Sequence, residues 1–480
     1  MGRHLISLIV AAAVSAALFY FGTGLHPAWW ITWFAPLPVL LAAPQVSRRS
    51  ALAAAVLAWA VGGLNMWRYE HDLLSMPVGI CLAILLMPSL FFALAVLLFR
   101  WLVRRGAVWQ AALAFPAAWV SYEYLTSALS PHSTFGNLAY SQMDYLPGLQ
   151  IASITGVWGI SFCLLLLPAT FATVLSGYGT KGEKRALAIV AGIFLAVVLG
   201  FGYWRVHTAP ASAGLITVGL IASDLPQNIL PVDRDSAVRL LGEYSSQVQN
   251  LSAQGAQVVV MPEKIAVVLD SYLDTIDGFF TSAAARSKVN IVVGIIHVSP
   301  GARWNEARVY SPDGKVAAIY EKHHMLPAYE SRLTPGTTRT LLRQPSGVWG
   351  ITICKDMDFP LLSRQYGNDG IGLLLTPAWD FTTDGWLHGR MAILRGVEDG
   401  FSMARAPKQG LLTVTDDRGR VLAERDTGSA PFATLVASVP VRHTDTFYAR
   451  FGDWFAWLSI AVMLVCTASG VRSRQSAPRG

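Results

Sequence analysis

Three reactive side chains stand directly after short apolar runs that are typical of β-strands. They are Glu263, Lys322 and Cys354, and each lies at the carboxyl end of such a run. In α/β proteins, the ends of strands present side chains from a rigid backbone to a crevice. The sequence therefore predicts that the three residues meet in one site.

This combination of side chains suits nucleophilic attack on a carbonyl carbon. A cysteine is a good nucleophile as the thiolate, so it needs a base within hydrogen-bond reach, and a carboxylate in a low-dielectric pocket such as that of Glu263 can serve. The attack creates an oxyanion. The ammonium of Lys322, together with a backbone N–H near Cys354, can stabilise that oxyanion by on the order of several kcal/mol.

Taken one at a time, the same residues also have structural interpretations. A glutamate after a strand is more often a cap or a surface ion pair, a lysine in the segment 321–324 is more often solvated, and an isolated buried cysteine usually only packs. Their shared placement favours the catalytic hypothesis. A metal site at His323 and His324 is a weaker alternative, because neighbouring strand residues point to opposite faces and no third ligand has suitable spacing.

The elements that must position these residues alternate between strands and helices. The predicted strands are 215–221, 257–261, 290–296, 307–311, 316–320, 348–353, 372–375, 411–415 and 434–439, and the predicted helices are 234–251, 272–287 and 386–404. This alternation predicts one α/β layered domain over residues 207–450.

The chain as a whole is too apolar to be one ordinary soluble domain. Of its 480 residues, 53% are hydrophobic and 14% are charged, against roughly 25% charged in soluble domains. Windows of about 20 apolar residues can cross a bilayer as helices. Such windows lie near 5–22, 29–43, 51–67, 77–99, 107–125, 149–175, 186–203 and 454–470. They predict a multi-pass bundle of about eight helices, seven within 1–206 and one in the segment 451–480, which ends in a basic tail.

The positions of lysine and arginine predict the topology. Basic residues concentrate at 48–49, 100–105, 181–185 and 472–479, whereas the loops between these segments have almost none apart from Arg68. Since cytoplasmic loops are enriched in such residues, the amino terminus is expected inside and the α/β domain outside the cytoplasmic membrane. The first window also resembles a signal peptide, but the spans that follow it favour an anchor.

Charge and cysteine content exclude other classes. The net charge is +7, but the basic residues do not cluster in the way that a polyanion requires, so no nucleic-acid partner is expected. Four cysteines are too few for a disulfide scaffold, and three of them lie in apolar stretches.

Several motifs resemble the nitrilase superfamily, and within it the apolipoprotein N-acyltransferase family. The segments 261–263, 322–330 and 353–354 are similar to the Glu, Lys and Cys motifs of the superfamily. The segments 140–142, 156–162 and 446–454 are similar to membrane signatures of the N-acyltransferases, which plain nitrilases lack.

The resemblance implies a four-layer αββα sandwich on an eight-helix bundle in a bacterial inner membrane, facing the periplasm. It implies that Glu263, Lys322 and Cys354 move an acyl chain from a phospholipid donor, through a thioester, to the N-terminal amine of a diacylglyceryl-cysteine lipoprotein. Glu330 and Asp356 stand at supporting positions, and no metal or organic cofactor is required.

The chain departs from the family at the mouth of the expected site. Lys355 replaces an aromatic residue beside the nucleophile, where a cation is expected to lower the thiol pKa or to change the acyl donor. Pro377 and Pro231 stand in segments that differ from the family pattern. These changes leave the acceptor open.

Three alternatives remain beside acyl transfer. A membrane-tethered amidase of the nitrilase type would resolve the thioester with water and hydrolyse a C–N bond. A silent membrane scaffold would keep the fold as a binding surface, although retention of all three reactive residues argues against it. A transporter is disfavoured because the spans show no inverted repeat with broken helices.

Overall fold

The computed structural model describes residues 2–208 and 214–472, and the chain divides into two compact units. One unit comprises Met1–His207 with Phe451–Gly480 and is helical. The other, Thr208–Arg450, has an α/β fold.

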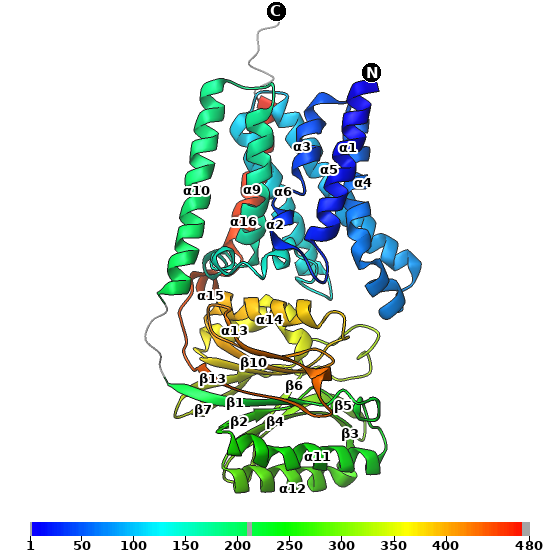
Figure 1. The fold of residues 1–480 in the computed structure, drawn as a ribbon, viewed down its shortest axis with the longest axis vertical. Helices are drawn as coiled ribbons and strands as arrows, with labels where there is room; N and C mark the ends of the chain where they lie inside the picture. Colours follow the sequence, from blue (N-terminus) through cyan, green and yellow to red (C-terminus); the bar gives the residue numbers. More distant parts are fainter. Residues whose placement is uncertain (1, 209–213, 473–480) are drawn as a thin grey trace, which may run out of the picture. The chain divides into compact units, whose positions relative to one another are not determined.

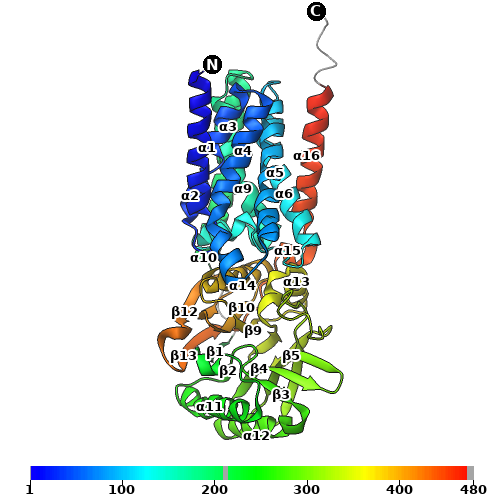
Figure 2. The same cartoon turned by 90° about the vertical axis from the view of Figure 1, so that its right-hand side faces the viewer.

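Long helices of the first unit run side by side (Figures 1 and 2). They are α1 (Gly2–Gly22), α4 (Arg48–Gly62), α5 (Val78–Val103), α6 (Val108–Leu129), α9 (Val157–Leu175), α10 (Lys181–His207) and α16 (Trp454–Arg472). Five segments among the described residues are long and apolar enough to cross a membrane: Arg48–Met66, Val78–Val103, Val157–Leu175, Lys181–His207 and Trp454–Val471. A buried core of small and aromatic side chains, including Phe92, Phe99 and Phe115, joins several of these helices.

The helices differ from the predicted windows in two places. The window 29–43 is split into α2 (Trp29–Thr32) and α3 (Leu37–Ala42), because Pro36 and Pro38 have no N–H with which to continue a helix. The window 149–175 becomes one continuous helix only from Val157. Gly156, just before it, has φ +67°, a left-handed backbone that interrupts a helix.

Two sheets form the centre of the α/β unit. The seven-stranded sheet has the order β13-β1-β2-β4-β5-β6, and β3 pairs with β4. Its strands are β1 (Leu215–Ala222), β2 (Val258–Val260), β3 (Val267–Leu269), β4 (Asn290–Ser299), β5 (Ala302–Tyr310), β6 (Val316–Glu321) and β13 (Ala433–Pro440). The six-stranded sheet runs β12-β11-β10-β9-β8-β7, with β7 (Thr340–Gln344), β8 (Gly347–Ile351), β9 (Leu373–Trp379), β10 (Ser402–Lys408), β11 (Leu411–Thr415) and β12 (Val421–Asp426).

Helices cover the outer faces of both sheets (Figure 1). The pair α11 (Arg234–Ala253) and α12 (Asp270–Ser287) packs on the seven-stranded sheet through a buried cluster that includes Leu240 and Phe280. The pair α13 (Pro360–Asn368) and α14 (Gly385–Asp399) lies by the six-stranded sheet. A second cluster, with Val260 and Ile351, fills the space between the sheets. The predicted α/β domain is thus confirmed as an αββα sandwich.

One predicted helix is wrong at its carboxyl end. The expected helix 386–404 stops at Asp399, and β10 begins at Ser402. Gly400 ends the helix with φ +76°, a conformation that L side chains rarely adopt. Strand β10, which the apolar helical pattern concealed, pairs in parallel with β9.

Candidate active site

The two sheets each contribute part of the predicted site. Glu263 follows β2 and Lys322 follows β6, both in the seven-stranded sheet, whereas Cys354 follows β8 of the other sheet. Cys354 opens a short 3₁₀ turn, Cys354–Asp358, and has φ +46°. Such strained backbone is uncommon outside glycine and concentrates at functional sites.

A buried lysine joins two carboxylates at the centre of the site. The Nζ atom of Lys322 donates to Glu263 Oε1 at 2.8 Å and to Glu330 Oε2 at 2.8 Å. All three side chains are at most 2% exposed. Buried charges need partners of opposite sign, and this arrangement provides them. The structure therefore brings together Glu263 and Lys322 of the predicted set, and it adds Glu330, for which the family resemblance implied a supporting position.

Two further residues contact the same carboxylates. Asn305 Nδ2 donates to Glu263 Oε1 at 2.6 Å and to Glu330 Oε1 at 3.0 Å, and Lys264 Nζ donates to Glu330 Oε1 at 2.7 Å. Neither was predicted from the sequence. Asn305 lies inside β5, and no sequence motif surrounds it. Lys264 directly follows Glu263, so its charge near a strand end could have indicated a site residue.

The second carboxylate oxygen of Glu263, Oε2, has surroundings that differ from those of Oε1. Among the residues that the structure describes, nothing donates a hydrogen bond to Glu263 Oε2, although the atom is buried. A buried carboxylate oxygen without a donor is costly and is free to accept a proton. Glu263 thus has one oxygen held by three donor groups and one available for proton transfer.

In this cluster, each charged group stabilises the charged form of its partners. Burial alone would lower the pKa of Lys322, but the carboxylates of Glu263 and Glu330 outweigh it and raise that pKa well above its ordinary value. Burial would raise the pKa of Glu330, but Lys322 and Lys264 hold it well below its usual range. The ammonium and the Glu330 carboxylate therefore both stay charged at neutral pH.

The nucleophile candidate is a protonated thiol in the free protein. Cys354 is half-buried and its Sγ donates to the carbonyl oxygen of Trp379 at 3.5 Å. Burial raises the pKa of Cys354, the negative charge of Glu263 raises it further, and Lys322 partly offsets both effects. The proton must therefore leave with the help of a base.

The sequence suggested that the charge of Lys355 lowers the thiol pKa or changes the acyl donor, and the structure shows that this charge is paired. Its side chain is buried and its Nζ lies 3.1 Å from Asp358 Oδ2, so its charge is paired, and the net shift of the Cys354 pKa is upward. Pairing inside a protein removes most of the effect that a free cation would exert.

Asp356 fastens the nucleophile turn to the segment that carries Lys322. Its fully buried carboxylate accepts from Tyr320 Oη at 2.7 Å, from the backbone N–H groups of His323 and His324, and from that of Ile353 at 3.1 Å. These donors come from the two strand ends that present Lys322 and Cys354. Asp356, which was expected at a supporting position, thus links the segments that carry Lys322 and Cys354.

One group of side chains has the composition of a metal site. Asp380, Asp384 and His388 place one ligand atom each within 4.8 Å of the others. However, Asp380 already accepts two hydrogen bonds from Arg405, at 2.5 and 2.8 Å, and His388 Nδ1 lies 3.0 Å from Asp384 Oδ2. These pairings already account for the charges of the group, and we assign it no metal.

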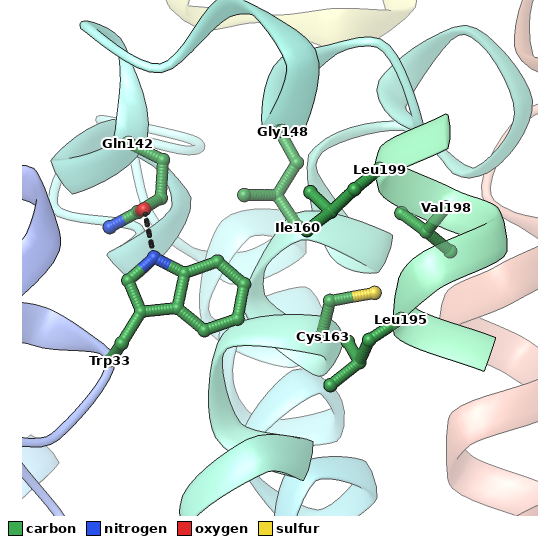
Figure 3. A pocket seen from close by; sticks show the side chains of 8 residues that line it. All are labelled: Trp33, Gln142, Gly148, Ile160, Cys163, Leu195, Val198 and Leu199. Atoms are coloured by element: carbon green, nitrogen blue, oxygen red, sulfur yellow. Dashed lines mark hydrogen bonds between the residues drawn. The ribbon is translucent and has the colours of Figure 1, made fainter. Parts of the chain in front are cut away.

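Two hollows of the helical unit contain none of the residues above. One, of about 10 Å³, lies where α9 faces α10 and is lined by Ile160, Cys163, Leu195 and their neighbours, beside the hydrogen bond from Trp33 to Gln142 (Figure 3). That volume holds no more than a water-sized probe. The other, near Leu41 and Tyr178, measures about 480 Å³. The candidate site therefore rests on the buried cluster of the α/β unit.

The αββα sandwich, with reactive side chains from both of its sheets, indicates a structural class of proteins. Residues 223–427 match the carbon-nitrogen hydrolase family model, and the described α/β unit has the fold of that class. Solved structures with similarity include a nitrilase superfamily member from Saccharomyces cerevisiae (21% identity, 51% of this chain, 97% of that chain, TM-score 0.42). Another is an amidase from Nesterenkonia sp. AN1 in complex with butyramide (21% identity, 51% of this chain, 96% of that chain, TM-score 0.42).

The helical unit is similar to a domain of a more specific family. Residues 15–170 match the apolipoprotein N-acyltransferase N-terminal domain. Proteins named apolipoprotein N-acyltransferase are similar over nearly the whole chain: 28% identity in Geobacter metallireducens, over 97% of this chain and 95% of that protein, and 25% in Vibrio vulnificus, over 96% and 97%. The chain is thus similar, over nearly its whole length, to proteins of the apolipoprotein N-acyltransferase family.

Proposed function

We propose that this protein transfers an acyl chain from a phospholipid to the N-terminal amine of a diacylglyceryl-cysteine lipoprotein. The observation that carries the proposal is the buried Lys322 between Glu263 and Glu330, with Glu263 Oε2 left without a donor among the described residues. Similarity to proteins named apolipoprotein N-acyltransferase indicates the substrate class.

In the first step, Glu263 takes the thiol proton of Cys354 as the sulfur attacks the ester carbonyl carbon of the phospholipid. The ammonium of Lys322 stabilises the oxyanion of the tetrahedral intermediate. The C–O bond to the glycerol then breaks, and the leaving alkoxide takes the proton from Glu263. The products are an acyl thioester on Cys354 and a lysophospholipid.

In the second step, the free amine of the acceptor attacks the thioester carbonyl. Glu263 accepts the proton that the amine loses, the C–S bond breaks, and the proton returns to the Cys354 sulfur. Glu330 keeps Lys322 charged and in place, and Asp356 holds the turn that presents Cys354. These steps use only side chains of the chain itself and need no nucleotide.

The reaction fits a membrane protein whose substrates are both lipid-anchored. Five apolar segments long enough to cross a bilayer support the membrane location. The distribution of lysine and arginine supports a periplasmic position for the α/β unit.

The test is mass spectrometry of the purified protein after incubation with phosphatidylethanolamine. We expect an acyl mass on the Cys354 peptide that neutral hydroxylamine removes and that Cys354→Ala lacks. A diacylglyceryl-cysteine lipopeptide with a free amino terminus should then take the acyl chain. The same lipopeptide with an acetylated amino terminus is the matched control and should remain unchanged.

Two outcomes would replace the proposal. Release of fatty acid alone, with the free lipopeptide unmodified, would assign the amidase-type reaction in which water resolves the thioester. Absence of any adduct on folded protein in the presence of lipid would reject acyl transfer and favour a silent scaffold.

A further inference from the structure

A second buried lysine, outside the Glu263, Lys322 and Cys354 set, connects the segments that carry the base and the nucleophile. Lys408 is the last residue of β10 and is fully buried. Its Nζ donates to the carbonyl oxygen of Lys264 at 2.9 Å and to that of Ile229. The same atom lies 3.8 Å from the ring centre of Trp379, within the range of a cation–π interaction.

The Lys264 contact bears on the general base. Lys264 has φ +50°, which is unfavourable for a residue with a side chain, so its surroundings must hold it there. The hydrogen bond from Lys408 to its carbonyl oxygen is one such restraint. In this conformation the Lys264 ammonium contacts Glu330, and the preceding residue, Glu263, presents its carboxylate to Lys322.

The Trp379 contact bears on the nucleophile. The carbonyl oxygen of Trp379 accepts the hydrogen bond from Cys354 Sγ, and the preceding residue, Ala378, accepts from the Glu263 backbone N–H at 3.1 Å. The Trp379 indole donates to Gln409, the residue after Lys408. The end of β9 therefore contacts the thiol of Cys354 and the backbone of Glu263, and Lys408 lies against its tryptophan.

We propose that Lys408 is a positioning residue that holds the Lys264 turn and the Trp379 ring together, and so sets the position of Glu263 relative to Cys354. This inference rests on the function proposed above. Lys408 Nζ contacts the carbonyl oxygens of Ile229 and Lys264 and the ring of Trp379, so it acts through the segments that it joins.

The charge of Lys408 is part of this role. Burial, and then the positive charge of Lys264, lower the pKa of Lys408 to about 7, while the carboxylates of Glu263 and Asp224 act in the opposite direction. The cation–π contact exists only in the charged form, which predominates below pH 7. The lysine therefore holds both segments most firmly in acid and less firmly as the pH rises through 7.

The experiment compares Lys408→Met with wild type in two assays between pH 6 and pH 8. One measures the rate of Cys354 acylation by phosphatidylethanolamine in a single turnover. The other measures alkylation of Cys354 by iodoacetamide, which does not depend on the natural substrate. Arg390→Met is the matched control, because it removes a cation 5.5 Å from a different tryptophan of the same unit, Trp386.

We expect Lys408→Met to slow acylation by about 10- to 100-fold at pH 6, as misplaced reacting groups do, with the deficit smaller at pH 8. Thermal unfolding of both variants establishes that they are folded. Equal rates for Lys408→Met and wild type, or an equal loss in Arg390→Met, would overturn the inference.

The two proposals fail in different ways. If wild-type protein is alkylated at Cys354 but never acylated by lipid, the proposed function fails, and the alkylation rates then decide the role of Lys408. If acylation proceeds normally in Lys408→Met, only the positioning role is lost.

Discussion

At the scale of single residues, the two carboxylate oxygens of Glu263 have different surroundings and different proposed roles. Oε1 lies against Lys322, Asn305 and Lys264, whereas Oε2 has no donor among the described residues. An oxygen held by several donors orients the side chain, and a free oxygen moves a proton. Removing the charge of Glu263 should therefore affect chemistry more than folding.

Glu263→Gln is expected to slow acylation of Cys354 by about 10²- to 10⁴-fold, the usual contribution of a general base. The amide is nearly isosteric, so the variant should still insert in the membrane and fold. Hydroxylamine-labile acyl mass after timed incubation with phospholipid measures the effect. A Glu263→Gln protein that acylates at the wild-type rate would exclude Glu263 as the base.

The pH dependence of Cys354 alkylation follows from its raised pKa. The thiol is neutral around pH 7. While the pH stays below the pKa, each increase of one pH unit raises the thiolate fraction about tenfold. Iodoacetamide alkylation should therefore keep increasing from pH 7 to about pH 9 without a plateau. The Cys354→Ala variant reports labelling of the other cysteines, and a plateau below pH 8 would contradict the raised pKa.

At the scale of elements, the site depends on where α14 gives way to β10. Helical periodicity continues past Asp399 in the sequence, and only the left-handed glycine at 400 marks the true end. A Cβ at Gly400 would lie 1.7 Å from the carbonyl oxygen of Thr444. The junction therefore requires glycine for its conformation and for its space.

Gly400→Ala is expected to destabilise the α/β unit by at least about 2 kcal/mol, through backbone strain and the clash with Thr444. Gly389→Ala, inside α14, is the matched control: its Cβ would meet nothing within 4 Å, and alanine favours a helix by about 1 kcal/mol. Thermal unfolding of both variants gives the comparison. Equal midpoints would refute this account of the junction.

The sequence could predict some residues of the site and not others, depending on how clearly it indicates the strand that carries each one. Glu263, Lys322 and Cys354 were accessible because each follows a strand that its β-branched run reveals. Lys408 was not, since β10 lay hidden behind a helical pattern. Asn305 was not, because β5 begins five residues before the predicted strand at 307, and a neutral amide inside a strand has no distinguishing neighbour.

At the scale of the whole molecule, the distribution of lysine and arginine predicts that the α/β unit lies outside the cytoplasmic membrane. The first described residues of α1 and the end of α16 lie at the same end of the helical unit (Figures 1 and 2). This agrees with an even number of crossings, as the alternation of basic loops predicts.

Cysteine labelling in cells with a permeabilised outer membrane tests the topology. Lys315→Cys, at a side chain that is 76% exposed in the α/β unit, should react with a membrane-impermeant maleimide while the inner membrane is intact. Lys181→Cys, at the exposed start of α10, should react only after the inner membrane is lysed. The reverse pattern would place the α/β unit in the cytoplasm.

The division of the site between two sheets has a consequence for how such a sequence evolves. The base and the nucleophile follow strands of different sheets, so the packed layer between the sheets, which includes Val260 and Ile351, helps to set the distance between them. A methylene gained on one sheet must then be balanced by one lost from the other. Lineages should accumulate such changes as compensating pairs, although none of these side chains ever meets a lipid.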